Sequence, residues 1–226
     1  METENKKINP YIIVIVILVL VIVGFAYNQW GKRIFPASIK EPEKPNINTE
    51  ISKYDIWIGN ENAPVTIVEY FSYLCGYCKL FEDETKPKII ENYVSTGKVK
   101  FVLRPFPIFS PDLKIDEAVL CANEQGKFLD FHNYVFANSD KLEKIENLKT
   151  FAKTVGLNET QFNQCFDSDK FRDRVETWYK QGVADFEKAG IASSQRGTPT
   201  FVINGELLIG AQSYERFVEV IESKLK

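Results

Sequence analysis

The stretch APVTIVEYFSYLCGYCKLF, residues 63–81, decides the fold. Residues 65–70 are rich in Val, Ile and Thr with an aromatic side chain close behind, a composition that predicts a buried strand. Two cysteines in C-x-x-C spacing, Cys75 and Cys78, follow at once, and a mixed polar and apolar run begins at Lys79. That run predicts a helix, so the sequence indicates a strand that carries a C-x-x-C to the N-terminus of a helix.

This placement of the two cysteines suits redox chemistry for a physical reason. The first N–H groups of a helix have no partner within the helix, and the helix dipole there favours negative charge. A thiol held at that position ionises more readily, and the thiolate is the nucleophilic form of cysteine. We therefore expect Cys75 to be the attacking thiol. Cys78, one turn further into the helix, is close enough to form a disulfide with it.

Two other uses of paired cysteines fit the sequence less well. A c-type haem attachment site needs a histidine directly after the second cysteine, and Lys79 occupies that position. A structural zinc site needs four ligands, usually with a second close pair of cysteines. The remaining cysteines, Cys121 and Cys165, stand far apart in the sequence, and His132 is the only histidine. We therefore favour redox chemistry and expect no metal ion and no cofactor.

Composition sets few further limits. The chain has 226 residues, enough for one large domain or two small ones, with 44% hydrophobic and 26% charged residues. The formal net charge of −3 gives no indication of nucleic-acid binding. The sequence also shows no internal repeat and no glycine loop of the phosphate-binding kind.

The N-terminal segment predicts an association with a membrane. Residues 1–10 form a short polar tail, and residues 11–27, YIIVIVILVLVIVGFAY, run without a charge. At ~1.5 Å per residue that run is at the short end of what spans a bilayer, and we expect a retained transmembrane anchor. A cleavable signal peptide, ending at the small-x-small sequence of residues 24–26, is the alternative. Residues 28–53 contain three prolines and predict a flexible tether, so the folded domain should begin at residues 54–56.

The rest of the chain carries separate strand and helix signals. Residues 99–103 predict a second strand, and residues 111–190 carry only helical patterns of apolar residues. Residues 200–203 and 206–209 predict a hairpin around the Asn-Gly turn at 204–205. A final helix follows. This order of elements predicts an α/β domain that is interrupted by a block of helices.

Three separated motifs resemble those of DsbA-like thiol–disulfide oxidoreductases. They are the run through APVTIVEYFSYLCGYC, CANEQGKF at 121–128 and GTPTFVING at 197–205, in the order found in that family. The resemblance covers about residues 55–226, nearly all of the predicted domain at 54–226. It implies a thioredoxin fold with an inserted helical subdomain at about 111–190. It also implies a function in making or shuffling disulfides in exported proteins.

The resemblance implies roles for five residues. Cys75 matches the exposed nucleophile of the family, and Cys78 matches its buried resolving thiol. Pro199 matches a proline held in the cis form beside the disulfide, which leaves the backbone of Thr198 free to pair with an extended substrate. Without the C-x-x-C, Pro199 would be an ordinary proline at the start of a strand. Glu69 matches a buried acid beneath the second cysteine, which implies a proton relay to Cys78.

Four other residues are interpreted with the same family in view. Lys100, on the neighbouring predicted strand, is a candidate partner for the lone charge of Glu69, with a solvent-facing lysine as the alternative. Tyr77 stands where strongly oxidising members commonly carry histidine, so we expect a weaker oxidant. Cys121 and Cys165 fall in segments that resemble those carrying a second cysteine pair in some relatives. We expect a structural disulfide between them, with two buried free thiols as the alternative.

The leading interpretation is an enzyme that introduces disulfides into exported proteins with free cysteines. We expect its catalytic domain on the extracytoplasmic side of the cell membrane, where disulfides persist. The resemblance implies a quinone-linked membrane protein as the reoxidant, and we expect a monomer that binds no nucleic acid. A reductase or isomerase with the same cysteine pair is the alternative, although residues 28–53 are too short for a dimerisation domain. A non-catalytic thioredoxin-fold binding module is a third interpretation, which the intact C-x-x-C disfavours.

Overall fold

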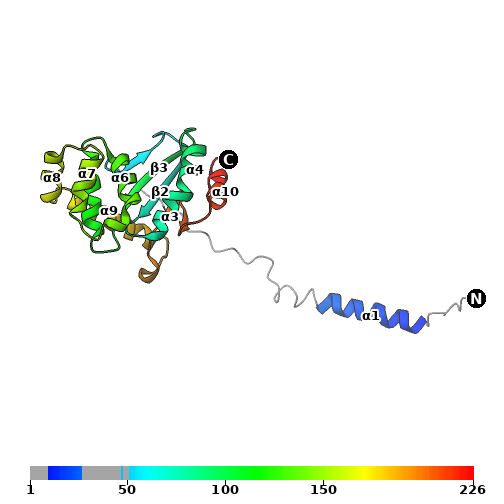
Figure 1. Ribbon diagram of the computed structural model, residues 1–226. Helices are drawn as coiled ribbons and strands as arrows, with labels where there is room; N and C mark the ends of the chain where they lie inside the picture. The colour runs from blue at the N-terminus through cyan, green and yellow to red at the C-terminus, as the bar shows by residue number, and fades with distance from the viewer. Residues whose placement is uncertain (1–9, 27–46, 48–50) are drawn as a thin grey trace, which may run out of the picture. The chain divides into compact units, whose positions relative to one another are not determined.

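The computed structural model of the chain describes residues 10–26, 47 and 51–226 (Figure 1). Contacts divide the chain into two units, residues 1–43 and residues 44–226. Residues 1–9 of the predicted tail and most of the predicted 28–53 tether lie outside the described residues.

Helix α1 (Pro10–Ala26) is the described element of the first unit. It has 17 residues, none of them charged. Within the described ranges, no helix is both long enough and apolar enough to cross a membrane. α1 coincides with residues 11–26 of the segment for which the sequence predicts an anchor, and the membrane role of that segment stays a prediction.

The second unit is built on a five-stranded sheet. Its strands are β1 (Ile56–Ile58), β2 (Val65–Phe71), β3 (Val99–Pro105), β4 (Thr200–Ile203) and β5 (Glu206–Ile209). They lie in the order β1-β3-β2-β4-β5, with β2 and β3 parallel and the other neighbours antiparallel. β2 is therefore the central strand, and the C-x-x-C follows its carboxyl end. The sequence predicted four of these strands and missed β1, because three residues are too few to show a periodicity.

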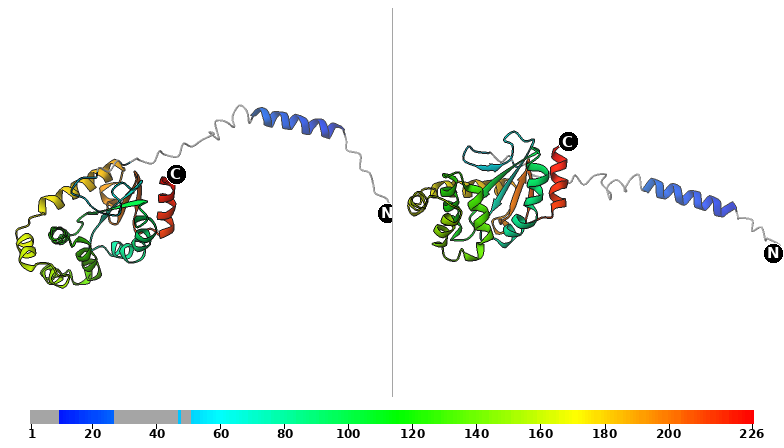
Figure 2. Two further views of the ribbon diagram at one scale, coloured as in Figure 1. Left: turned by 90° about the horizontal axis from the view of Figure 1, so that it is seen from above. Right: turned by 45° about the horizontal axis from the view of Figure 1, so that its top comes forward.

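The helices fall into two groups. One group flanks the strands in sequence: α3 (Gly76–Glu84), α4 (Lys86–Ile89), the π-helix η2 (Ile90–Val94), the short η4 (Ser193–Gln195) and α10 (Tyr214–Lys224). The other forms an insertion between β3 and β4: α5 (Asp112–Asn123), α6 (Phe128–Ala137), η3 (Ser139–Lys141), α7 (Asn147–Thr154), α8 (Glu159–Asp167) and α9 (Arg172–Lys188). Figures 1 and 2 show α6 to α9 gathered at one side of the sheet, with α4 and α10 at the other. The predicted α/β fold with a helical insertion is confirmed.

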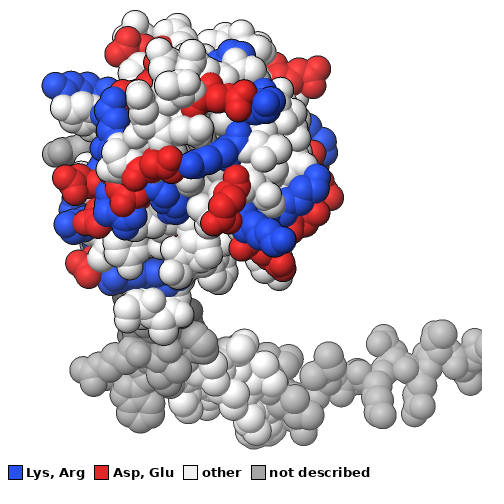
Figure 3. Space-filling view, turned by 60° about the vertical axis from the view of Figure 1, so that its left-hand side comes forward, with Lys and Arg blue, Asp and Glu red and all other residues white. Residues whose placement is uncertain are grey.

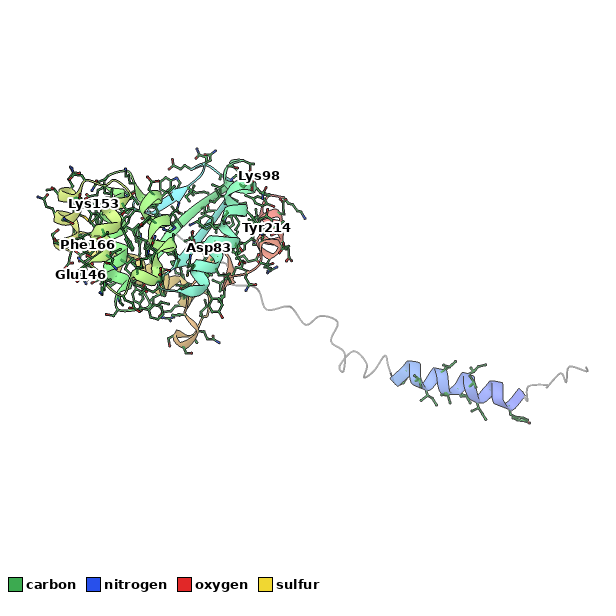
Figure 4. All side chains as sticks on the ribbon, viewed as in Figure 1. Asp83, Lys98, Glu146, Lys153, Phe166 and Tyr214 are labelled. Atoms are coloured by element: carbon green, nitrogen blue, oxygen red, sulfur yellow. A yellow bond between two sulfur atoms is a disulfide. The ribbon has the colours of Figure 1, made fainter. Side chains whose placement is uncertain are left out.

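The side-chain view shows the same division. Phe166 of α8 and Glu146, just before α7, lie at one side of the domain, while Tyr214 at the start of α10 lies at the opposite side (Figure 4). On the face shown in Figure 3, acidic and basic side chains are interspersed. This mixture of charges agrees with the small formal net charge of −3.

The two faces of β2 contribute to separate cores, because successive residues of a strand point to opposite faces. Ile67 and Phe71 belong to the larger core, which also includes Cys78 and the inserted helices. Val68 and Tyr70 belong to a smaller core on the other face. The active-site helix therefore covers one face of the central strand.

A buried polar network crosses the smaller core. The Tyr70 hydroxyl donates to Asp185 of α9 at 2.5 Å and accepts from Nη1 of Arg104 at 2.9 Å. Arg104 also donates to Asp55 from Nη2 at 2.6 Å and from Nε at 3.0 Å. Because every charged member has an opposite charge beside it, the network can be buried without a lone ion. It joins the last inserted helix, the sheet and the segment before β1.

The folded domain begins earlier than the sequence predicted. Ile47 is 1% exposed in the smaller core, and Ile51 packs against the same core. The N–H of Ile47 donates to the carbonyl oxygen of Gly205, in the β4–β5 turn, at 3.1 Å. The prediction that the tether continues to residue 53 is therefore wrong. An isolated isoleucine among polar residues has no periodic neighbours, so its burial leaves no signal in the sequence.

Replacing Ile47 by alanine should reveal this contribution. We expect Ile47→Ala to lower the free energy of unfolding by about 2 kcal/mol, because a buried aliphatic side chain is removed. Urea unfolding of the full chain measures it. The control, Ile209→Ala, removes a side chain that is 46% exposed, and should cost less than about 1 kcal/mol. Equal losses for the two variants would place Ile47 outside the core.

Candidate active site

The two cysteines of the C-x-x-C have different positions on α3. Cys75 is the N-cap residue of the helix, with φ −87° and ψ 117°, and it is half-buried. Cys78 lies in the first turn of the helix and is fully buried. Both are free thiols in this structure. A substrate can therefore reach the Cys75 sulfur, while Cys78 faces the core.

The loop before β4 forms the second half of the site. The peptide bond between Thr198 and Pro199 is cis. Tyr70 of β2 pairs with Thr200 of β4, so residues just before β4 lie beyond the carboxyl end of β2, where Cys75 begins its helix. The Cys75 thiol accordingly donates to the carbonyl oxygen of Thr198 at 3.1 Å. The structure thus brings together Cys75, Thr198 and Pro199, as expected from the sequence.

The surroundings of the two thiols shift their pKa values in opposite directions. The hydrogen bond that the Cys78 thiol donates lowers the pKa of Cys75 to about 5, with help from the side chain of Thr198 and the N–H groups of Cys78 and Tyr77, and against partial burial. Burial raises the pKa of Cys78, as do its hydrogen bond to Cys75 and the nearby Glu69. At neutral pH the reduced pair is therefore one thiolate and one thiol. This division suits an exposed nucleophile and a protected resolving group.

Glu69 lies on β2, beneath Cys78. Its side chain is fully buried, and neither carboxyl oxygen has a hydrogen-bond partner among the described residues. Burial raises the pKa of Glu69 well above its ordinary value; the nearby Glu82 raises it further, and Lys86 acts in the opposite direction. A buried acid with a raised pKa can hold a proton close to the resolving thiol.

The predicted pairing of Lys100 with Glu69 is wrong. In the sheet register Glu69 pairs with Leu103, and Lys100 pairs with Thr66. Since side chains alternate along β3, Lys100 points to the face opposite Leu103. Its ammonium group instead lies 5.8 Å from the centroid of the Trp57 ring.

Four further residues, Lys86, Glu82, His132 and Tyr73, lie on the Glu69 side of the sheet, and no sequence signal assigned them to the site. The Lys86 ammonium donates to Glu82 at 2.6 Å and lies 3.1 Å from Nε2 of His132. Lys86 and His132 hold the pKa of Glu82 at about 2, although burial opposes this. On the other side of the imidazole, Nδ1 of His132 lies 2.7 Å from the hydroxyl of Tyr73. Glu82 and Lys86 are spaced i, i+4, which in a sequence is typical of an exposed helix pair.

Comparison with known proteins agrees with this arrangement. A thioredoxin family model matches residues 51–223, from before β1 to the last helix. The chain belongs to the thioredoxin family. The match includes both halves of the site, the C-x-x-C and the loop with the cis-proline.

Individual relatives of this thioredoxin-family chain have related names. It is 28% identical over 188 residues to a Rickettsia typhi protein provisionally named protein-disulfide oxidoreductase, covering 79% of this chain and 66% of the relative. It is 28% identical over 179 residues to disulfide bond formation protein D of Bacillus subtilis, covering 75% and 76%. The crystal structure of α-DsbA1 from Wolbachia pipientis matches with a TM-score of 0.68 at 27% identity, covering 79% of this chain and 94% of that one. The chain spans about two thirds of the length of the Rickettsia relative.

The second cysteine pair of this thioredoxin-family chain lies within the helical insertion. Cys121 of α5 and Cys165 of α8 form a disulfide, with their Cα atoms 5.8 Å apart and a sequence separation of 44. Closing a loop of that length stabilises the folded chain by about 4 kcal/mol in the chain-entropy estimate. The bond joins two helices of the insertion and is separate from the Cys75–Cys78 pair.

The raised pKa of Glu69 predicts how its removal changes stability with pH. The folded chain holds the Glu69 proton more tightly than the unfolded chain does, so stability is lost as pH rises above the unfolded pKa of about 4.3. Glu69→Gln cannot ionise. The variant should therefore gain stability relative to the natural chain by up to about 1.4 kcal/mol per pH unit above that point.

Urea unfolding at a series of pH values from 5 to 7 measures the difference between the two proteins. The matched control is Glu91→Gln, which removes an exposed acid and should show a much smaller pH dependence. A difference between Glu69→Gln and the natural chain that stays constant with pH would contradict the raised pKa.

Proposed function

We propose that this chain is a thiol–disulfide oxidoreductase of the DsbA type that works through Cys75 and Cys78. One observation carries the proposal: two thiols one helical turn apart have opposite surroundings. Cys75 is accessible, caps α3 and has its pKa lowered to about 5. Cys78 is buried beside Glu69 with its pKa raised. The names of the relatives support the same reaction.

The reaction begins with an oxidised Cys75–Cys78 disulfide. A substrate thiolate attacks the Cys75 sulfur, the enzyme disulfide breaks, and Cys78 leaves and takes up a proton, which we assign to the buried Glu69. A second substrate thiolate then attacks the substrate sulfur of the mixed disulfide, and Cys75 leaves as a thiolate. The substrate loses two electrons and gains a disulfide, while the enzyme gains two electrons and becomes a dithiol. In reverse, Cys78 gives its proton to Glu69 and attacks the mixed disulfide.

Oxidation of substrates is the direction that we favour. A stabilised thiolate favours the reduced enzyme, which makes the enzyme an oxidant. The lowered pKa of Cys75, about 5, lies between the values of about 3.5 for a strong oxidant and about 7 for thioredoxin. Tyr77 supplies no positive charge, in line with an oxidant weaker than those with histidine there. A reductase or isomerase that uses the same pair is the alternative. A reduction potential of the Cys75–Cys78 couple close to that of thioredoxin, about −270 mV, would favour it.

We place the reaction outside the cytosol, on exported proteins with free cysteines. The Cys121–Cys165 disulfide supports this location, because structural disulfides persist in oxidising compartments. The charge-free segment at 11–27 supports export, either as a membrane anchor or as a signal peptide. A quinone-linked membrane protein is the proposed reoxidant, and a monomer is the proposed state.

Trapping the mixed disulfide tests the proposed roles of the two cysteines. Cys78→Ala, incubated with a disulfide-bonded peptide, should accumulate a covalent adduct on Cys75, because no thiol remains to resolve it. The natural chain should not accumulate it. Cys75→Ala is the matched control and should react at least about a hundredfold more slowly, since its remaining thiol is buried and protonated.

Non-reducing gels and mass measurement identify the adduct, and dithiothreitol should remove it. An adduct on Cys75→Ala but not on Cys78→Ala would reverse the two roles. Failure of both variants to form an adduct, with both folded, would contradict the proposed activity.

A further inference from the structure

One buried carboxylate, that of Asp112, joins the loop between β3 and α5 to the turn before the C-x-x-C. We propose that Asp112 is a positioning residue for a polypeptide substrate, because it holds the exposed side chains of Ile108 and Phe109 in a fixed place beside Cys75. The inference rests on the proposed function, and it concerns a residue that touches neither thiol.

Asp112 is the first residue of α5 and is fully buried. On the loop side, its Oδ2 accepts from the N–H of Ile108 at 2.9 Å and from the N–H of Phe109 at 2.9 Å. On the turn side, its two oxygens accept from the hydroxyl of Ser72 at 3.0 and 2.9 Å. A single carboxylate therefore bonds two segments that are 36 residues or more apart in sequence.

The hydrogen bonds continue from Asp112 to the reactive cysteine. The Ser72 hydroxyl, itself buried, accepts from the N–H of Leu74 at 3.1 Å. The Ser72 carbonyl oxygen accepts from the N–H of Cys75 at 3.2 Å. The position of the Asp112 carboxylate is thus related to that of Cys75 through the short turn at residues 72–74. None of these contacts involves a sulfur atom.

The loop between β3 and α5 carries exposed apolar side chains that have no part in the exchange reaction of the two cysteines. β2 and β3 are parallel with Phe71 opposite Pro105, so the turn and the loop leave the sheet at the same edge. Between them, the N–H of Phe106 donates to the carbonyl oxygen of Phe71 at 2.7 Å. The loop then exposes Ile108 (39%) and Phe109 (49%). Exposed apolar side chains at the same edge of the sheet as an accessible thiolate suit an unfolded polypeptide, whose own apolar residues are uncovered.

A carboxylate suits this position. It accepts several hydrogen bonds at once and lies at the N-terminus of α5, where the dipole favours negative charge. Burial raises its pKa, while the donated hydrogen bonds from Phe109, Ile108 and Ser72 act in the opposite direction. Asp116, one turn later on α5, is also buried, but its oxygens have no hydrogen-bond partner among the described residues. Of the two acids, only Asp112 connects the loop with the turn.

The experiment compares two reductants of the oxidised full-length chain. Dithiothreitol is too small to need the loop, whereas a reduced synthetic peptide with one cysteine between apolar residues should contact Ile108 and Phe109. We expect Asp112→Ala to lower kcat/KM for the peptide about tenfold, mainly through KM, and to lower the dithiothreitol rate much less. Asp112→Asn keeps one oxygen acceptor and should recover most of the loss. Asp116→Asn is the matched control and should react with both as the natural chain does.

Ser72→Ala provides a second variant that cuts only the turn side of the connection. It should show the same selective loss for the peptide, smaller in size, and it carries the test if Asp112→Ala does not fold. Equal losses with peptide and dithiothreitol in folded variants, or no loss with the peptide, would overturn the role of Asp112. Failure of the natural chain to react with either reductant would instead overturn the proposed function.

Discussion

Stabilisation of the Cys75 thiolate at the N-terminus of α3 is the interaction on which the rest of the site depends. The helix presents the N–H groups of Tyr77 and Cys78 to the sulfur, and the Cys78 thiol donates to it. That donor must keep its own proton, which burial ensures by raising the pKa of Cys78. The buried Glu69 then supplies a place for this proton during exchange. Cys75 is accessible because it caps α3, and Cys78 is buried because it lies one turn further into the same helix.

The topology explains how segments far apart in sequence meet at this helix. β3 runs parallel to β2 and ends at the same edge of the sheet, whereas β4 runs antiparallel and begins there. The helical insertion between β3 and β4 therefore starts and finishes beside the C-x-x-C. Asp112 lies at the start of the insertion, and Thr198 and Pro199 follow its end. Thr198 is 123 residues after Cys75 in the sequence.

The sequence predicted the parts of the site that are local and missed those that depend on facing side chains. A strand followed by C-x-x-C and a helix is a short-range pattern, and Glu69 stood out as an acid within apolar residues. The prediction that Lys100 is the partner of Glu69 was wrong. Side chains alternate along β3, so Lys100 points to the other face of the sheet. Ile47 was placed in the tether because it has no periodic neighbours in the sequence, although it is buried in the smaller core. Each of these errors concerns a contact made only after the sheet has formed.

The pH at which Cys75 ionises in the reduced full-length chain tests the central claim most directly. The ultraviolet absorbance of the thiolate, or the rate of alkylation of Cys75, follows the ionisation, and Cys75→Ser provides the blank. Since the folded pKa is lowered, thiolate should form as pH rises through about 5. Below that pH both thiols should be protonated and alkylation slow. A midpoint near the ordinary cysteine value of about 8.5 would show that α3 does not stabilise the thiolate and would contradict the account.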